Sequence, residues 1–284
     1  MNNSTIESPH IQTVSIRVTQ LKEAKTFYTE VIGLKILAES EDELKLGSGG
    51  RVLLQIYTGA SSKKLAGKAG LYHFALLVPA REDLGSVLHH LMEVHAPLQG
   101  GADHIFSEAI YLNDPDGNGI EIYCDRPKDQ WQVQEDGSLP LASDPLDAEE
   151  LLKIRNQWQG LPDQTVIGHI HLHVANIKEA FHFYHQLLGF QVKIRLGNQA
   201  LFLAADEYHH HIGLNTWAGE GVPPNPAQAA GMRECVFHVN EEREILQLAK
   251  RLKEDGYSYS LTSHDLKVVD PSGNHLRFTL KAQY

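Results

Sequence analysis

The chain repeats itself, and this repetition constrains the fold more than any other feature of its 284 residues. The segment that runs from Ile11 to Gly33 returns between Ile167 and Gly189, an offset of 156 residues. A second pair of segments, 70–118 and 231–274, shares an apolar strand pattern that leads to an Asp-Pro-x-Gly-Asn motif. The chain is therefore expected to consist of two halves with two modules each.

The hydrophobic pattern changes in the same order within every module. An alternating segment predicts a strand, a helical pattern such as 23–31 or 243–254 follows, and short alternating segments predict further strands. Gly33 and Gly189 suit helix C-caps, and the Asp-Pro-x-Gly-Asn motifs suit tight turns between strands. The predicted fold class is α+β, with four βαβββ modules in tandem that form two domains with curved, cup-like mixed sheets.

The repeats also predict where the units begin and end. The modules are expected at residues 10–58, 70–124, 166–217 and 231–280. They form a first domain, 1–126, and a second, 165–284, joined by a linker over 127–164. The linker carries four prolines and an acidic segment over 146–158 that is predicted to be helical. We interpret it as a connection that wraps from one half to the other.

Composition narrows the classes of partner. A net charge of −11 opposes binding to nucleic acid or anionic lipid, because phosphates would be repelled. No apolar run approaches the roughly 18 residues of a membrane span, and the amino terminus lacks the features of a signal peptide. Cys124 and Cys235 each stand alone in an apolar strand pattern, which indicates buried thiols rather than a disulfide. We expect a cytoplasmic protein whose partner is a small molecule.

The chain contains 17 histidines, and three of them lie in one predicted strand. The segment 168–174 alternates apolar residues with His169, His171 and His173. Its apolar face should meet the helix of the module, so its histidine face should look into the space that the curved sheet encloses.

Alignment of the modules shows which polar residues share a position. The first strands place His73 and His169 at equivalent sites, and the last strand of module two carries Glu121 on the matching face. Two imidazoles and one carboxylate are the facial ligand set of non-haem Fe(II), which leaves about three coordination positions open. A lone histidine on an apolar strand is more often a core residue, but this coincidence at repeat positions favours a metal site.

The same positions in modules one and four carry different chemistry. Thr13 and Glu234 are the equivalents of the two histidines, and Arg277 is the equivalent of Glu121. A guanidinium would repel a cation at that place. We therefore expect a decayed or purely structural site there.

These features resemble the vicinal oxygen chelate (glyoxalase/bleomycin resistance/dioxygenase) superfamily, and more closely its catechol 2,3-dioxygenase members, the type I extradiol enzymes. The resemblance covers 11–280 and is carried by the motifs Gly-Leu-Tyr-His-Phe at 70–74, Asp-Pro-Asp-Gly-Asn-Gly-Ile-Glu at 114–121, Gly-His-Ile-His-Leu-His-Val at 168–174 and His-His-His-Ile-Gly-Leu-Asn-Thr-Trp at 209–217. It implies cleavage of catechol or a substituted catechol with O2 at an Fe(II) held by His73, Glu121 and His169. Mn(II) or another divalent metal could occupy the same ligands.

The order of the ligands departs from the pattern of familiar extradiol enzymes. Those enzymes carry His, His and Glu within the carboxy-terminal half, whereas His73, Glu121 and His169 are divided between both halves. Module two is therefore expected to pair with module three, and module one with module four. Pairing of sequential modules is the minor alternative.

The resemblance also implies roles for residues around the metal. It places the acid-base histidine on His210, with His211 as its rival, and a tyrosine that hydrogen-bonds the substrate oxygen on Tyr111. A further histidine is expected at His104. His171 and Trp217 are candidates for contact with the substrate. The alternatives are that His171 only lines a polar cup and that Trp217 packs as an ordinary strand residue.

Other activities fit the same superfamily. A hydroquinone ring-cleaving enzyme is a close variant of the main hypothesis. A glyoxalase-like lyase or isomerase would need a fourth ligand, usually Glu or Gln, near Gly213. A metal-free binding module is a third possibility, but it would not explain why His73, Glu121 and His169 occupy matching positions in the repeats. A homo-oligomer, either dimer or tetramer, is expected from exposed sheet edges and the habit of the superfamily.

Overall fold

The computed structural model describes residues 10–280, and each of the four modules in it folds as one strand, one helix and three strands. Module one contains β1 (His10–Arg17), α1 (Leu21–Thr26), the π-helical turn η1 (Phe27–Val31), β2 (Lys35–Glu39), β3 (Glu43–Ser48) and β4 (Arg51–Tyr57). Module two contains β5 (Gly70–Leu77), α2 (Arg81–Glu93), β6 (Leu98–Asp103), β7 (Ser107–Asn113) and β8 (Gly119–Asp125).

The second half repeats this order. Module three contains β10 (Val166–His173), α4 (Ile177–Phe181), the π-helical turn η3 (His182–Leu187), β11 (Gln191–Leu196), β12 (Ala200–Ala204) and β13 (Ile212–Asn215). Module four contains β14 (Gly231–Val239), α5 (Glu242–Glu254), β15 (Tyr259–Leu261), β16 (Asp265–Val269) and β17 (His275–Leu280). The predicted α+β fold with βαβββ modules is confirmed.

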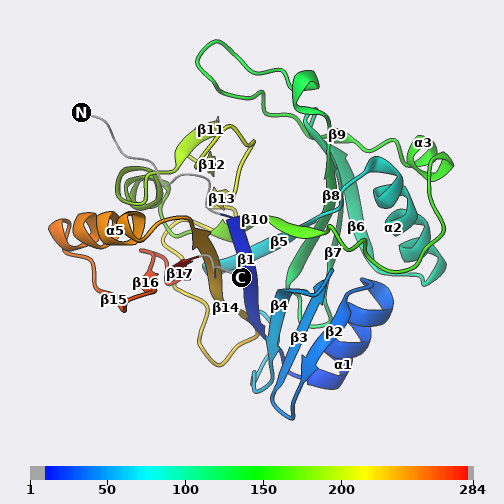
Figure 1. The fold of residues 1–284 in the computed structure, drawn as a ribbon, viewed down its shortest axis with the longest axis horizontal. Coiled ribbons are helices and arrows are strands. Elements are labelled where there is room, and N and C mark those ends of the chain that lie inside the picture. The colour runs from blue at the N-terminus through cyan, green and yellow to red at the C-terminus, as the bar shows by residue number, and fades with distance from the viewer. Residues whose placement is uncertain (1–9, 281–284) are drawn as a thin grey trace.

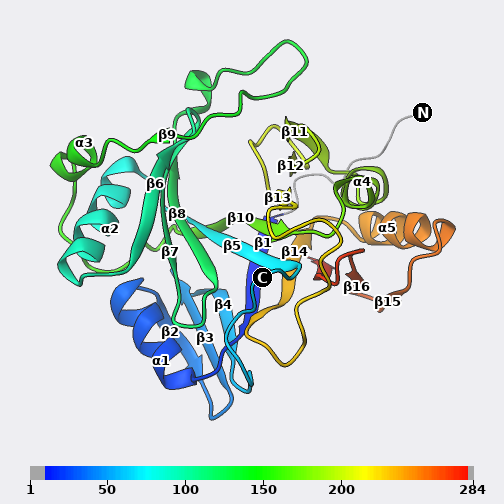
Figure 2. The same ribbon diagram turned by 180° about the vertical axis from the view of Figure 1, so that it is seen from behind.

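The strands form two mixed sheets, and each sheet takes one module from each half (Figures 1 and 2). One sheet has the order β15-β16-β17-β14-β1-β4-β3-β2, and the other has the order β11-β12-β13-β10-β5-β8-β7-β6-β9. Antiparallel pairing of β1 with β14 and of β10 with β5 joins the modules. Module two thus shares a sheet with module three, the pairing expected from the ligand positions.

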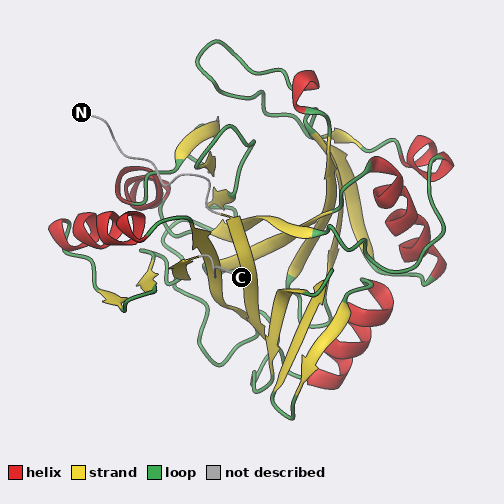
Figure 3. Cartoon of the chain, in the orientation of Figure 1, coloured by secondary structure: helices red, strands yellow, loops and turns green. Residues whose placement is uncertain are grey.

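The helices lie at the periphery and the strands lie in the middle (Figure 3). Helix α5 shows why, because its residues Ile245, Leu248 and Leu252 recur at helical spacing and are buried against the sheet. One contiguous core contains residues of all four modules, and it includes the free thiols of Cys124 and Cys235. Within residues 10–280, no helix is both long and apolar enough to cross a membrane.

Each Asp-Pro-x-Gly-Asn motif forms the expected turn and also fixes a helix of the preceding module. The carboxylate of Asp114 accepts hydrogen bonds from the backbone of its own turn and from the buried Tyr28 hydroxyl at 2.9 Å. Asp270 repeats the arrangement with Tyr184, also at 2.9 Å. These contacts join neighbouring modules of the same half, although those modules belong to different sheets.

Replacement of Tyr28 by phenylalanine is expected to lower the free energy of unfolding by about 1–3 kcal/mol, because a buried acceptor loses a hydrogen bond. Tyr184→Phe is the matched variant in the second half and should cost a similar amount. Urea unfolding followed by circular dichroism would measure both. Equal stability of both variants and the wild type would show that these bonds do not hold the modules together.

The connection between the halves contains η2 (Lys128–Gln130), the short strand β9 (Asp144–Pro145) and α3 (Ala148–Lys153). Helix α3 begins with the Asp147 side chain as its cap and is shorter than the helix predicted over 146–158. The chain leaves the helix because backbone groups of Asn156 bond to the Ser86 hydroxyl of α2 instead of continuing the helical ladder. Trp158 then stacks on His90, with ring centroids 4.2 Å apart.

Candidate active site

Three neighbouring strands, β10, β5 and β8, position a buried group of two histidines and one glutamate. The antiparallel register places His169 opposite Ala75, and the parallel register places Glu121 opposite the same residue. His73 lies two residues before Ala75 and therefore on the same face of the sheet. The small Ala75 leaves room for the three larger side chains to converge.

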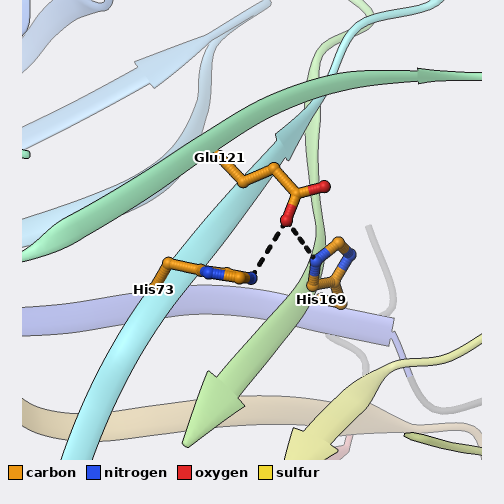
Figure 4. Close-up of side chains that lie close together, drawn as sticks. All are labelled: His73, Glu121 and His169. Atoms are coloured by element: carbon orange, nitrogen blue, oxygen red, sulfur yellow. Dashed lines mark hydrogen bonds and ion pairs between the residues drawn. The ribbon is translucent and has the colours of Figure 1, made fainter. Parts of the chain in front are cut away.

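The ligand atoms of this group lie close together (Figure 4). Oε2 of Glu121 is 3.0 Å from Nε2 of His73 and 3.1 Å from Nε2 of His169. Two ligands about 2.1 Å from one ion and at right angles to each other would be about 3 Å apart. Among residues 10–280 this is the group of His, Cys, Asp or Glu whose atoms could hold a metal ion.

The hydrogen bonding of the group also fits a cation. Nε2 of His73 is buried and has no hydrogen-bond partner, although Oε2 of Glu121 lies 3.0 Å away. A buried polar atom without a partner is costly, and coordination of an ion would satisfy it. The donor set of two imidazoles and one carboxylate therefore forms a site for a divalent metal ion.

Burial controls the charges around this site. It lowers the pKa of His169 to about 4, so the imidazole is neutral and free to act as a ligand at neutral pH. Burial also raises the pKa of Glu121, but the adjacent imidazoles of His169 and His73 outweigh it and hold that pKa well below its usual range. The carboxylate is thus ionised and contributes the negative charge that a cation requires.

A cavity of about 340 Å³ opens over the three ligands, a size within the range for small-molecule sites. All the predicted site residues except His211 line it. Its walls come from modules two and three and from the linker. The residues that line it are Tyr72, His73, His104, Phe106, Ser107, Tyr111, Glu121, Leu141, Ala142, Ser143, His169, His171, Ile194, Leu196, Phe202, His210 and Trp217.

His104 and Tyr111 form a hydrogen-bonded pair on one wall. Nδ1 of His104 lies 2.7 Å from the Ala142 carbonyl, which can only accept, so this nitrogen carries the hydrogen. In a neutral ring Nε2 then accepts from the Tyr111 hydroxyl, 2.7 Å away. Burial and the nearby Glu121 carboxylate raise the pKa of Tyr111 well above its usual value, so the phenol keeps its proton.

The two candidate acid-base histidines lie in different places. His210 lines the cavity, with its ring centroid 4.1 Å from that of His169. His211 lines a separate cavity with Tyr208 and Asp206, and its Nδ1 accepts from the backbone of Ala205. The two residues are adjacent in the chain just before β13, and their side chains enter different cavities.

His171 also lines the cavity, and it lies directly across from Gly213 in the parallel pairing of β10 with β13. A Cβ atom at Gly213 would come within 2.7 Å of the His171 ring, so this position has no room for a side chain. The amide of Asn215 donates to Nε2 of His171 at 2.9 Å and fixes the ring. Trp217 is 48% exposed and stands at the rim of the cavity, with its ring 5.6 Å from Tyr72.

The equivalent positions of modules one and four hold an ion-pair network. The Arg277 guanidinium bonds both oxygens of Asp265 and lies 4.0 Å from Glu234. Thr13 donates to the backbone of Val52. Such contacts give these side chains structural partners. That these positions form a decayed or purely structural site stays a prediction.

Sequence reasoning missed two residues behind His210. His209 is fully buried, and Asp125, at the end of β8, accepts a hydrogen bond from its Nε2 at 2.9 Å. The run of three histidines was visible, but the spacing of 84 residues to Asp125 gave no signal that the two would meet.

The chain is similar in sequence to known proteins. The sequence profile of the Glyoxalase/Bleomycin resistance protein/Dioxygenase superfamily matches residues 10–122 and 166–278. A catechol-2,3-dioxygenase of Bacillus subtilis (strain 168) is 41% identical over 281 residues, which cover 96% of this chain and 98% of that protein.

Solved structures share the fold at low sequence identity. A Bacillus subtilis protein described as a dioxygenase superimposes with a TM-score of 0.70 at 13% identity, over 98% of this chain and 86% of its own. Glyoxalase I from Zea mays superimposes with a TM-score of 0.60 at 14% identity, over 96% of this chain and 92% of its own. The fold is therefore common to proteins of different activity, and the side chains in the cavity must distinguish them.

Proposed function

Because the chain belongs to the glyoxalase/bleomycin resistance protein/dioxygenase superfamily, we propose that it is an extradiol dioxygenase that opens the ring of catechol or a substituted catechol with O2. The observation that carries this proposal is the buried group of His73, Glu121 and His169 at the base of a cavity. The 41% identity to a catechol-2,3-dioxygenase over nearly the whole chain supports the same activity.

We propose Fe(II) as the ion that these three residues hold, with Mn(II) or another divalent metal as the alternative. Bound there, ferrous iron would supply the redox chemistry between the diol and O2. With three protein ligands, such an ion would have room for the two adjacent hydroxyls of the diol and for O2.

The chain's own side chains then position the substrate and move protons. His210 accepts the proton that a substrate hydroxyl loses and returns a proton as the ring opens. The Tyr111 oxygen, whose own proton is directed toward His104, accepts a hydrogen bond from the substrate. Phe106, Phe202 and apolar neighbours pack on the ring and exclude water.

Two other activities fit the cavity less well. A glyoxalase-like lyase would need a fourth ligand near Gly213, where a Cβ atom would collide with His171. Hydroquinone carries its hydroxyls at opposite ends of the ring, so it could reach one ion through a single oxygen. The two adjacent hydroxyls of catechol could both reach the same ion.

The proposed partners are a small aromatic diol and O2. A homo-oligomer, dimer or tetramer, is also proposed, because β2 and β11 form open sheet edges that another chain could cover.

The test is anaerobic reconstitution with Fe(II), then addition of catechol and air while the absorbance of a yellow ring-opened semialdehyde is followed. Guaiacol, in which one hydroxyl is methylated, is the matched control because it cannot bind through two hydroxyls. We expect yellow product from catechol alone. Stoichiometric iron without product from catechol or its substituted forms would contradict the proposal.

A further inference from the structure

A chain of hydrogen bonds leads from His210 away from the cavity. Nδ1 of His210 lies 2.7 Å from Nδ1 of His209, and Nε2 of His209 lies 2.9 Å from the Asp125 carboxylate. A carboxylate only accepts, so Nε2 of His209 carries a hydrogen. In the neutral ring Nδ1 of His209 is then an acceptor, and the hydrogen between the two rings belongs to His210.

We propose that His209 and Asp125 are positioning residues that hold His210 in the tautomer with hydrogen on Nδ1, which leaves its Nε2 bare to accept the proton of the substrate. This inference rests on the function proposed above. Neutral imidazole has two tautomers, and the hydrogen bond at one nitrogen decides which nitrogen is bare. The logic is that of the aspartate that orients the histidine of a serine-protease triad.

The surroundings of His209 hold it rigidly. Its side chain is fully buried, its ring stacks on Phe106 with centroids 4.6 Å apart, and Trp131 lies against it at 5.5 Å. The linker residue Trp131 thus helps to fix a ring of module three. A group locked by packing and hydrogen bonds loses little entropy when it orients a catalytic side chain.

Asp125 is held in place by hydrogen bonds. Its second oxygen accepts a hydrogen bond from the Tyr208 hydroxyl at 2.9 Å, and the Tyr123 hydroxyl lies 2.6 Å from that of Tyr208. Asp125 ends the same strand that carries Glu121, so β8 supplies both a metal ligand and the anchor of this chain. The anchor therefore has a fixed position relative to the metal site.

Steady-state kinetics of the iron-loaded enzyme provide the first test. Both His209→Phe, which keeps a flat ring, and Asp125→Asn should lower kcat about 100-fold, the lower end of acid-base contributions, with KM for catechol nearly unchanged. Asp125→Glu keeps the carboxylate and should recover much of the loss. If His209→Phe does not fold, the two Asp125 variants carry the test alone.

Asp255→Asn is the matched control. It makes the same chemical change at an exposed ion pair, in which Asp255 lies 2.8 Å from Nε2 of His182 on the surface. Its kcat should equal that of the wild type. Wild-type kcat in Asp125→Asn, or in a folded His209→Phe, would overturn the proposal.

A second measurement does not depend on activity. In metal-free protein labelled with ¹⁵N-histidine, the imidazole shifts distinguish the two tautomers, and loss of signals in His210→Gln assigns those of His210. We expect hydrogen on Nδ1 in the wild type and a changed tautomer distribution in His209→Phe. Hydrogen on Nε2 of His210 in the wild type would disprove this inference, whether or not the enzyme cleaves catechol.

Discussion

Replacement of His169 by alanine is expected to abolish ring cleavage, because it removes one of three ligands and leaves Glu121 and His73 to hold the ion alone. Loss of an outer partner of a metal ligand already weakens binding about 10–100-fold, so loss of the ligand itself should cost at least about 100-fold. Metal content after dialysis, measured by mass spectrometry, and semialdehyde formation would show the effect.

The repeat supplies a matched control for this variant. Thr13 occupies the equivalent strand position in the other sheet and bonds to the Val52 backbone. Thr13→Ala should keep full metal content and turnover. An active His169→Ala enzyme with full metal content would contradict a ligand set that draws on both halves.

Replacement of His210 by glutamine is expected to lower kcat by about 10²–10⁴, the range for loss of a general acid-base group. Metal content should remain that of the wild type, since His210 contacts the His169 ring without belonging to the ligand set. Stopped-flow absorbance of the iron-loaded variant with catechol would measure the chemical step.

His211→Gln separates the two candidate histidines. His211 lines a different cavity, with Tyr208 and Asp206, so its replacement should leave kcat close to that of the wild type, without the roughly 10²–10⁴-fold loss expected for an acid-base group. A large loss of kcat in His211→Gln with little loss in His210→Gln would reverse the assignment.

The fold could be predicted because the sequence patterns that indicate its strands and helices are local and are repeated along the chain. Alternation along strands and helical periodicity occur four times in the same order, so each module supported the assignment of the others. The pairing of modules came from a single argument, that His73, Glu121 and His169 had to meet. The short helix α3 was overestimated because the competing bond between Asn156 and Ser86 is a tertiary contact.

The candidate site was predictable only in part, for a similar reason. The ligands lie on regular strands, where alternation shows which face a side chain occupies. His210 and His211 precede a strand, so the sequence could not decide which of them faces the cavity. The contact of Asp125 with His209 joins a strand end to a loop across 84 residues, and no local pattern encodes it.

Each sheet contains one module from each half of the chain, and this arrangement makes the connection between the halves important. Neither half contains a complete sheet, so the pieces of a chain cut between them would have to find each other in solution before any ligand set could form. The linker makes that encounter intramolecular, so an effective concentration set by the length and stiffness of the linker replaces the concentration of separate pieces. The segment that closes one wall of the cavity therefore also sets how often the two halves meet.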